Sequence, residues 1–358
     1  MKRADVAVVG AGLFGTSLAC KLARAGMRVE LYDRATPGAG DTGRSFGMVR
    51  AHYSNEVTVR LAKRGIELLA GDPRSAYVRT GYLLPVAEAD RAACAANVEL
   101  GRSLGVATAL VEPDEIAHLE PRLRTDGIAV AAYERDGGVV DPGRMTLASF
   151  AEAVSLGVDV HLGSQVVGVE SLDARTVVVA AGGWSKRLLL ELPVELRRID
   201  VLRVAPMRVS VVVSDTVTNV VVRPGVGDVA WAVAYSKPEV YADRDDAPEN
   251  PRPEYPQTVR TALEERYHDA YNLAWIDGWT GAYDATPDWN PIVGFVRDGV
   301  YAIAGMSGHG LKLAPAIAEC VAAELAGTEP PIDLRPLRFS RFAEGDLLRL
   351  AYGPSARA

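Results

Sequence analysis

The stretch DVAVVGAGLFG, residues 5–15, decides the fold of this 358-residue chain. Its first five residues have the apolar composition of a buried strand, and the glycines follow them directly. We assign Gly10 to a tight turn, Gly12 to the close approach of a pyrophosphate to the backbone, and Gly15 to the packing of the following helix on the strand. The stretch therefore predicts a dinucleotide site.

The next residues complete a β-α-β unit. Leu18 and Leu22 repeat at helical spacing, Gly26 ends the helix, and a second apolar strand over residues 29–32 leads to Asp33. A carboxylate at this place accepts hydrogen bonds from ribose hydroxyls, which favours adenosine with a free 2′-hydroxyl over a 2′-phosphate. An unliganded α/β unit with a glycine-rich turn is the alternative.

The composition limits the class of protein. The length predicts two lobes with sizeable cores. The net charge of −7, with no basic run, argues against nucleic acid as the main partner. The cysteines, Cys20, Cys94 and Cys320, are scattered and form no CxxC pair, so we expect neither a disulfide framework nor a metal site.

The location of the protein is also an expectation from sequence. No apolar run approaches the roughly twenty residues of a membrane span, and the nucleotide strand starts too close to Met1 for a signal peptide. We therefore expect a soluble, cytoplasmic protein without a membrane partner.

Further along, the chain alternates between helical and strand patterns. We expect helices over residues 57–69, 90–104 and 145–156. The apolar run TVVVAA, residues 176–181, predicts a strand buried on both faces, as in a parallel sheet, although a plain core strand is an equal alternative.

The second half of the chain changes character. Residues 201–240 contain β-rich runs that predict an antiparallel sheet carrying a substrate lobe, and the charged, proline-rich residues 243–256 predict a solvated loop or lid. The arrangement of strand, glycine-rich turn and helix then occurs a second time, with the strand over residues 301–304, the turn over 305–310 and the helix ending at about residue 325.

These motifs occur in the order seen in FAD-dependent amino-acid and amine oxidoreductases. They are GAGLFG with Asp33, VVDPGRM at 139–145, TVVVAAGGWS at 176–185, TPDWNPIVG at 286–294 and AGMSGHGLK at 304–312. The chain resembles the D-amino-acid oxidase superfamily, and within it the branch of monomeric sarcosine oxidase and N-methyl amino acid oxidases. The resemblance covers most of the chain and is weakest in the substrate lobe.

The resemblance implies an α/β fold with an α+β second lobe, in which a Rossmann-like FAD-binding domain is joined to a substrate domain with a mixed antiparallel sheet. The FAD-binding domain would comprise residues 1–81, 139–196 and 286–345. The substrate domain would comprise 82–138 and 197–285, and residues 346–358 would form a C-terminal tail.

The resemblance also implies the cofactor contacts. In the family, the last glycine-rich turn passes beside the flavin ring and starts a helix whose positive end faces N1 and C2=O; an ordinary capped helix is the alternative. The expected FAD-binding residues are Gly10, Gly12, Gly15, Asp33, Arg34, Ser45, Val166, Ala181, Gly182, Gly305, Gly308, Gly310, Leu311 and Lys312.

Two cationic residues are the expected substrate clamp. By resemblance, Arg50 and Lys312 hold the substrate carboxylate, which places the reacting C–H over flavin N5. Arg50 could instead bind a flavin phosphate or a surface acid. Lys312 is harder to explain otherwise, because a cation at a helix start opposes the dipole. His309 could contact substrate or flavin, or serve only the geometry of its loop.

The chain departs from the sarcosine oxidase branch at two positions. The cysteine that attaches FAD in that branch aligns at or near Gly281, so we expect non-covalent FAD. The lysine that activates oxygen in that branch aligns with Ala232, and Lys237 is the nearest lysine. A dehydrogenase with another electron acceptor is therefore plausible, unless the alignment is wrong by a few residues.

Together these observations predict an FAD enzyme that oxidises the C–N bond of a small carboxylate-bearing amine, with oxygen or another acceptor taking the electrons. Because the deprotonated amine reacts, we expect a modestly basic pH optimum. An NAD-dependent dehydrogenase and a non-catalytic FAD-binding partner protein are the alternatives. The sequence fixes neither the substrate nor the oligomeric state.

Overall fold

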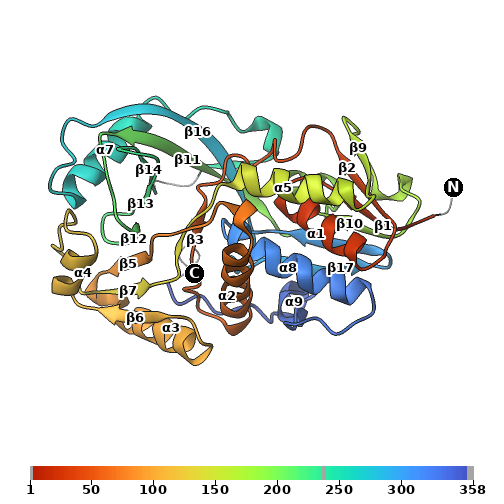
Figure 1. Ribbon diagram of the computed structural model, residues 1–358, viewed down its shortest axis with the longest axis horizontal. Helices are drawn as coiled ribbons and strands as arrows, with labels where there is room; N and C mark the ends of the chain where they lie inside the picture. Colours follow the sequence, from red (N-terminus) through yellow and green to blue (C-terminus); the bar gives the residue numbers. More distant parts are fainter. Residues whose placement is uncertain (1–2, 236–238, 353–358) are drawn as a thin grey trace.

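The computed structural model describes residues 3–235 and 239–352. Its first layer is a six-stranded sheet with the order β17-β18-β10-β1-β2-β9 (Figure 1). The described neighbours run parallel, except that β17 is antiparallel to β18. The strands are β1 (Ala4–Val9), β2 (Val29–Asp33), β9 (Asp159–Leu162), β10 (Ala174–Val179), β17 (Ile292–Arg297) and β18 (Val300–Ala304).

Both faces of this sheet are buried, as its apolar strands predict. Helices α1 (Leu13–Arg24), α5 (Pro142–Ser155) and α8 (Gly310–Leu325) cover one face. On this face Val8 packs in one core with Leu18 and Ile317, whereas Val9 belongs to a second core on the opposite face. The alternation of side chains along a strand thus accounts for the continuous apolar runs.

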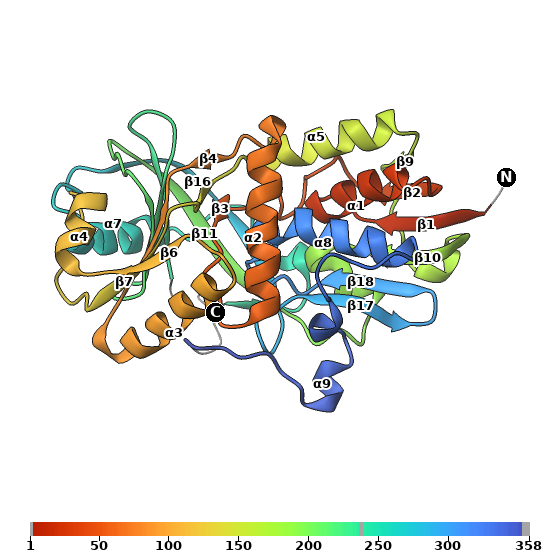
Figure 2. The same cartoon turned by 60° about the horizontal axis from the view of Figure 1, so that its bottom comes forward.

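Helix α2 (Glu56–Gly71) stands between the two halves of the molecule and packs against α8 (Figure 2). Asn55 caps its first turn by accepting a hydrogen bond from the amide of Thr58 at 3.0 Å. Its expected range, 57–69, is confirmed with slightly longer ends.

The second layer is a nine-stranded sheet built from two separate stretches of chain. Its main path is β15-β11-β14-β13-β12-β5-β7-β6, and β16 pairs with β11. Neighbours are antiparallel except β12 and β5, which run parallel and join the two stretches. The strands are β5 (Tyr82–Val86), β6 (Thr108–Val111), β7 (Val130–Glu134), β11 (Glu195–Ala205), β12 (Val212–Asp215), β13 (Val220–Pro224), β14 (Ala230–Ala234), β15 (Val240–Tyr241) and β16 (Ala274–Ala285).

The two faces of this sheet have different neighbours. Val222 and Ala232 belong to the core that includes Leu263 of α7 (Tyr255–Arg266). Val221 and Val233 point the other way, toward the first layer. This second face therefore supplies a wall between the layers.

Short elements complete the described chain. A three-stranded sheet between the layers consists of β3 (Met48–Val49), β8 (Gly138–Val139) and β4 (Val78–Arg79). The remaining helices are α3 (Arg91–Ser103), α4 (Pro113–Leu119), α6 (Ser185–Leu188) and α9 (Arg341–Glu344). The 3-10 turns are η1 (Pro73–Ser75), η2 (Glu88–Asp90), η3 (Val169–Ser171), η4 (Gly182–Trp184), η5 (Arg244–Asp246) and η6 (Arg335–Leu337).

The expectation of a solvated loop or lid over 243–256 is wrong in part. Arg244 in η5 is 6% exposed because its guanidinium forms an ion pair with Asp41, and α7 already begins at Tyr255. The mixed α/β fold is as expected, and none of the helices described here is long and apolar enough to cross a membrane.

Candidate functional site

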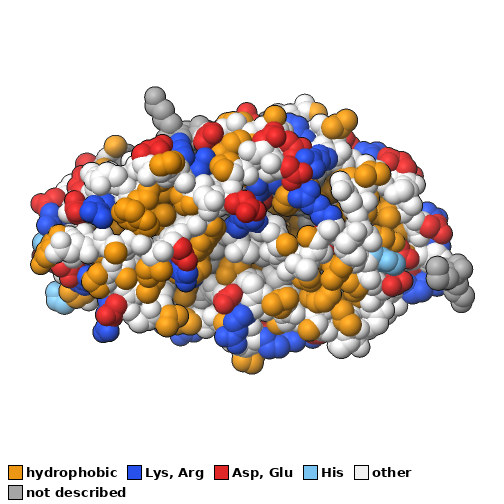
Figure 3. Space-filling model, turned by 90° about the horizontal axis from the view of Figure 1, so that it is seen from above, with side chains coloured by type: hydrophobic (Ala, Val, Ile, Leu, Met, Phe, Trp, Pro, Cys, Tyr) orange, Lys and Arg blue, Asp and Glu red, His pale blue; other side chains and the backbone are white. Residues whose placement is uncertain are grey.

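A cavity of about 450 Å³ lies between the two sheets. The first layer contributes the turn after β1, the end of β2 and the start of α8, while the second contributes β11, β13, β14 and β16. In Figure 3, side chains of both charges gather near the middle of the face seen from above, with apolar patches on either side. A binding site enclosed by both layers follows from this arrangement.

The first glycine-rich turn has the geometry that its motif requires. Gly10 has φ of +111°, and a Cβ there would lie 2.4 Å from the carbonyl oxygen of Ala180. A Cβ at Gly15 would lie 1.7 Å from the oxygen of Gly10, so helix and turn can meet only at glycine. Gly12 lines the cavity and precedes α1, which has neither a capping side chain nor an acidic first turn. These amides suit a phosphate.

Asp33 lies at the same end of the cavity. One carboxylate oxygen accepts the amide of Ala11 at 2.6 Å, and the other accepts the amide of Ala35 at 2.7 Å. The carboxylate thus fixes the turn, and Asp33 also lines the cavity. Its contact with ribose stays a prediction.

The second glycine-rich turn is held from beneath by Asp284 of β16. Its carboxylate accepts the amides of Gly305 at 2.8 Å and Met306 at 3.1 Å. Burial raises the pKa of Asp284 to about 7, although these amides oppose the rise. At Gly308, where φ is +81°, a Cβ would lie 2.9 Å from the ring of Tyr283. The turn therefore depends on glycine and on this carboxyl group.

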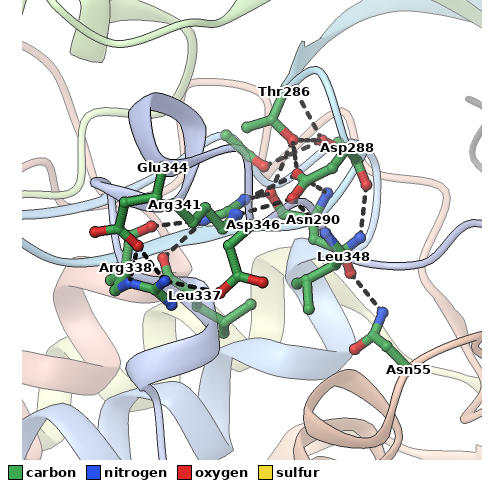
Figure 4. A network of polar contacts seen from close by, with 12 residues as sticks. Asn55, Thr286, Asp288, Asn290, Leu337, Arg338, Arg341, Glu344, Asp346 and Leu348 are labelled. Atoms are coloured by element: carbon green, nitrogen blue, oxygen red, sulfur yellow. Dashed lines mark hydrogen bonds and ion pairs between the residues drawn. The ribbon is translucent and has the colours of Figure 1, made fainter.

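A buried network anchors the TPDWNP segment behind the turn (Figure 4). Asp288 forms a two-bond ion pair with Arg341 of α9, with both distances 2.8 Å. Asn290 accepts hydrogen bonds from Asn55 and Thr58 at the start of α2. Thr286 approaches Ser307 in the turn at 3.3 Å. The network links α9, α2 and the turn into one support.

Arg50 and Lys312 are brought together around one tyrosine ring. They are 1% and 2% exposed, and the ring centroid of Tyr53 lies 4.3 Å from the Arg50 guanidinium carbon and 6.0 Å from Lys312 Nζ. Arg50 also donates to the carbonyl of His52. Burial, followed by the charge of Arg50, lowers the pKa of Lys312 well below its usual value. Two cations this deeply buried favour an anionic partner.

His309 lies in the same cluster and, like Arg50, is not among the residues that line the cavity, whereas Lys312 is. It is 1% exposed and meets Tyr53 edge-on, with 5.2 Å between ring centroids. Burial, Lys312 and Arg50 lower its pKa well below the usual range, so the ring is neutral. Neither ring nitrogen has a hydrogen-bond partner in the described chain. Its chemical role stays a prediction.

Most of the expected FAD-binding residues line the cavity. They are Gly10, Gly12, Asp33, Arg34, Ser45, Val166, Ala181, Gly182, Gly308, Gly310, Leu311 and Lys312. Gly15 and Gly305 lie behind its wall, where the absence of a Cβ permits close packing. Arg34 is already engaged, since it forms an ion pair with Asp245 at 2.8 Å and stacks on Trp184.

Ala232, which aligns with the oxygen-activating lysine of the sarcosine oxidase branch, does not face the cavity. Ala232 packs toward α7, and Val233 occupies the cavity side of β14. A shift of one residue reverses the face of a strand, so this position cannot be assigned from the alignment. Lys237 lies outside the described residues. Gly281 does line the cavity, and the three cysteines are buried and free.

Several site residues escaped the sequence analysis. Glu134 and Asp284 are isolated acids whose burial depends on pairings made far away in the chain. Val201 and Val221, which form part of the apolar wall, were predicted only as strand residues. Alternation along β11 and β13 could have identified one inward face, but not its position opposite the glycine-rich turns.

The site therefore has the form of a flavoprotein's cofactor cavity. Gly12 and Gly182 expose backbone to it, and a Cβ at Gly182 would meet nothing within 4 Å. Together with the open start of α1 and the carboxylate of Asp33, these residues fit the pyrophosphate and ribose of FAD.

Comparison with known proteins identifies the family. The chain belongs to the family of FAD-dependent oxidoreductases, whose model matches residues 5–324. It is 25% identical over 377 residues to glycine oxidase of Geobacillus kaustophilus, covering 95% of this chain and 97% of that protein. The predicted superfamily, its FAD cofactor and the oxidoreductase class are confirmed.

Solved structures share the fold. The L-proline dehydrogenase from P. horikoshii has a TM-score of 0.89 at 23% identity, covering 97% of this chain and 100% of that one. The L-amino acid deaminase from Proteus vulgaris has a TM-score of 0.81 at 22% identity, covering 95% and 94%.

Proposed function

We propose that this protein oxidises the C–N bond of a small amine that carries a carboxylate, such as an N-methyl, cyclic or α-amino acid. The observation that carries the proposal is the pair of buried cations, Arg50 and Lys312, beside the start of α8. The names of the relatives, a glycine oxidase, a proline dehydrogenase and an amino acid deaminase, support the same substrate class.

The chain's own residues would bind and orient the substrate. Arg50 and Lys312 hold its carboxylate by charge-assisted hydrogen bonds, which fixes the adjacent C–N bond in one orientation. Val201, Val221 and Val233 exclude water from the other side. Bound FAD supplies the hydride acceptor, flavin N5. The substrate loses a hydride from carbon and a proton from nitrogen, giving an imine that water hydrolyses.

The acceptor that reoxidises the reduced flavin distinguishes two versions of the function. Oxygen as the acceptor would give hydrogen peroxide, and another acceptor would make the protein a dehydrogenase. Among the described residues, Lys312 is the only lysine that lines the cavity, and Lys237 lies outside them, so the rate of flavin reoxidation by air decides between the two versions.

The test follows the flavin spectrum under anaerobic conditions while N-methyl, cyclic, and D- or L-amino acids are added. Bleaching by one group of carboxylated amines, but not by the matching amines without a carboxylate, is the expected result. Readmitted air then separates oxidase from dehydrogenase by the rate at which the colour returns. A yellow protein that no carboxylated amine bleaches would contradict the proposal and favour a non-catalytic role.

A further inference from the structure

A buried carboxylate lies behind the two cations of the clamp. Glu134, the last residue of β7, is 2% exposed, and its carboxylate accepts the amide of Ala51 at 2.7 Å. Ala51 directly follows Arg50. Across the ladder Glu134 is paired with Tyr82, whose ring centroid lies 5.8 Å from the Arg50 guanidinium carbon. The backbone contact and the strand register thus both place this acid beside Arg50 of the clamp.

The remaining neighbours carry little charge. Tyr53 and Tyr82 have pKa values raised by burial, and His309 is neutral. Burial and the charge of Arg50 lower the pKa of His52 to about 3, so it is also neutral. Asp136, on the turn after β7, is partly exposed and paired with Arg79. The buried charges are therefore those of Arg50, Lys312 and Glu134.

These three groups influence one another in a definite direction. Burial raises the pKa of Glu134 to about 7, against the two cations, which lower it. Burial and Arg50 lower the pKa of Lys312, and Glu134 opposes them. No hydrogen bond or ion pair of the Lys312 ammonium is found within residues 3–235 and 239–352, so the carboxylate is its main electrostatic support.

We propose that Glu134 is a positioning residue that keeps Lys312 charged and limits the clamp to a net charge of +1, which matches a single carboxylate. This inference rests on the proposed function. With one carboxylate bound, two cations and two anions balance in a dry site. A ligand with two adjacent carboxylates would bring one buried negative charge without a partner, so we expect the clamp to select against it.

The test measures how acetate and malonate perturb the visible spectrum of the FAD-loaded protein between pH 6.5 and 9. In the wild type, acetate binding weakens as Lys312 loses its proton at high pH. In Glu134→Gln that loss should move to lower pH, so acetate binding should weaken at a lower pH than it does in the wild type. Between pH 7 and 8, where Glu134 of the wild type is ionised, the same variant should bind malonate relatively better than the wild type does, and below pH 7 the two proteins should become alike.

Glu120→Gln is the matched control. Glu120 is also fully buried, accepts the amide of Ser210 and has a pKa raised by burial, but its cationic neighbour is Arg122 rather than Arg50 or Lys312. Its variant should keep the wild-type pH profile. Glu134→Asp, which retains the charge, should also keep the wild-type midpoint.

The outcomes separate the two ideas. A Glu134→Gln profile identical to that of the wild type, with acetate bound by both, would overturn the role of Glu134 and leave the proposed function standing. Acetate that perturbs no form of the protein would overturn the clamp and this inference with it. The wild type alone gives a second test. As the pH falls toward 7 and Glu134 takes up its proton, the affinity for malonate should rise relative to the affinity for acetate. A ratio of the two affinities that does not change with pH would contradict the inference.

Discussion

Lys312 is the residue whose surroundings most directly predict a function. Its ammonium is buried at the start of α8, where the helix dipole and Arg50 both disfavour a cation. Lys312→Met should lower kcat/KM for carboxylated amines by about 10- to 100-fold, the value of one charged hydrogen bond, while FAD stays bound. Steady-state kinetics with the flavin content measured in parallel will check this.

Lys186→Met is the control for loss of a lysine. Lys186 is partly buried and donates to the carbonyl of Val194 at 3.0 Å, away from the clamp. Equal losses of kcat/KM in the two variants would show that Lys312 has no special role in substrate binding.

Asp284 predicts a pH dependence of stability. Its pKa of about 7 in the folded protein lies above its ordinary value of 3.8, so between about pH 4 and 7 the folded state binds more protons than the unfolded state. This residue therefore makes the protein less stable as the pH rises through that window. Asp284→Asn does not titrate, so its Tm relative to the wild type should rise from pH 4 to 7. A constant difference in Tm would contradict the burial argument.

What the sequence could predict differs between residues. The roles of Gly10 and Gly15 follow from local geometry, because a Cβ at either position meets backbone. The burial of Glu134 and Asp284 could not be predicted, since it results from strand pairings between distant parts of the chain. Arg50 and Lys312 were identified through resemblance, and their binding to substrate stays a prediction.

At the level of elements, α9 is held to the site by the ion pair of Asp288 and Arg341, whose side chains are 1% and 0% exposed. Asp288→Asn leaves a buried guanidinium without its counter-charge and should cost about 3–5 kcal/mol of unfolding free energy. The pair of Asp333 and Arg335 is the exposed equivalent, at 51% and 88%, and Asp333→Asn should cost less than about 1 kcal/mol. Denaturant unfolding of both variants gives the comparison, and equal costs would contradict the assignment.

The contact between α2 and α8 determines where Lys312 lies. A Cβ at Gly65 would lie 1.9 Å from the carbonyl oxygen of Lys312, so Gly65→Ala must push the two helices apart. We expect a lower Tm and weaker acetate binding. Gly71→Ala, at the end of the same helix, meets nothing within 4 Å and should leave both values within error or raise Tm slightly. Acetate affinity unchanged in Gly65→Ala would show that the clamp tolerates this displacement.

The positions of helices and strands with a regular hydrophobic pattern were predicted well, whereas the directions in which their side chains face were not. Helix α2 and strand β10 lie where their patterns indicated. The direction in which Ala232 faces could not be predicted, because adjacent residues of a strand face opposite sides and an alignment shifted by one residue moves a side chain from the cavity to the core. The burial of Arg244 could not be predicted because it depends on an ion pair with Asp41 and on packing against Gly183, which are both distant in the chain.

At the scale of the whole molecule, a charged bridge joins the second layer to the mouth of the cofactor cavity. Asp245 of η5 accepts the indole N–H of Trp184 at 2.8 Å and forms ion pairs with Arg34 at 2.8 Å and Arg187 at 2.7 Å. Trp184, Arg34 and Arg187 line the cavity. Because these three residues line the cavity that FAD would leave, breaking their contacts with Asp245 should change the rate at which FAD dissociates.

The partly exposed charges of this bridge predict a dependence on salt. Arg34 and Asp245 are 37% and 43% exposed, so added salt should weaken their attraction and speed the release of FAD from the wild type. Asp245→Asn should release FAD several-fold faster at low salt and show a smaller salt effect, followed as the recovery of flavin fluorescence. Asp277→Asn removes a similarly exposed partner of Arg203 away from the cavity and should behave like the wild type. Release that is equally fast in all three proteins would mean that the bridge stays closed, or plays no part, when FAD dissociates.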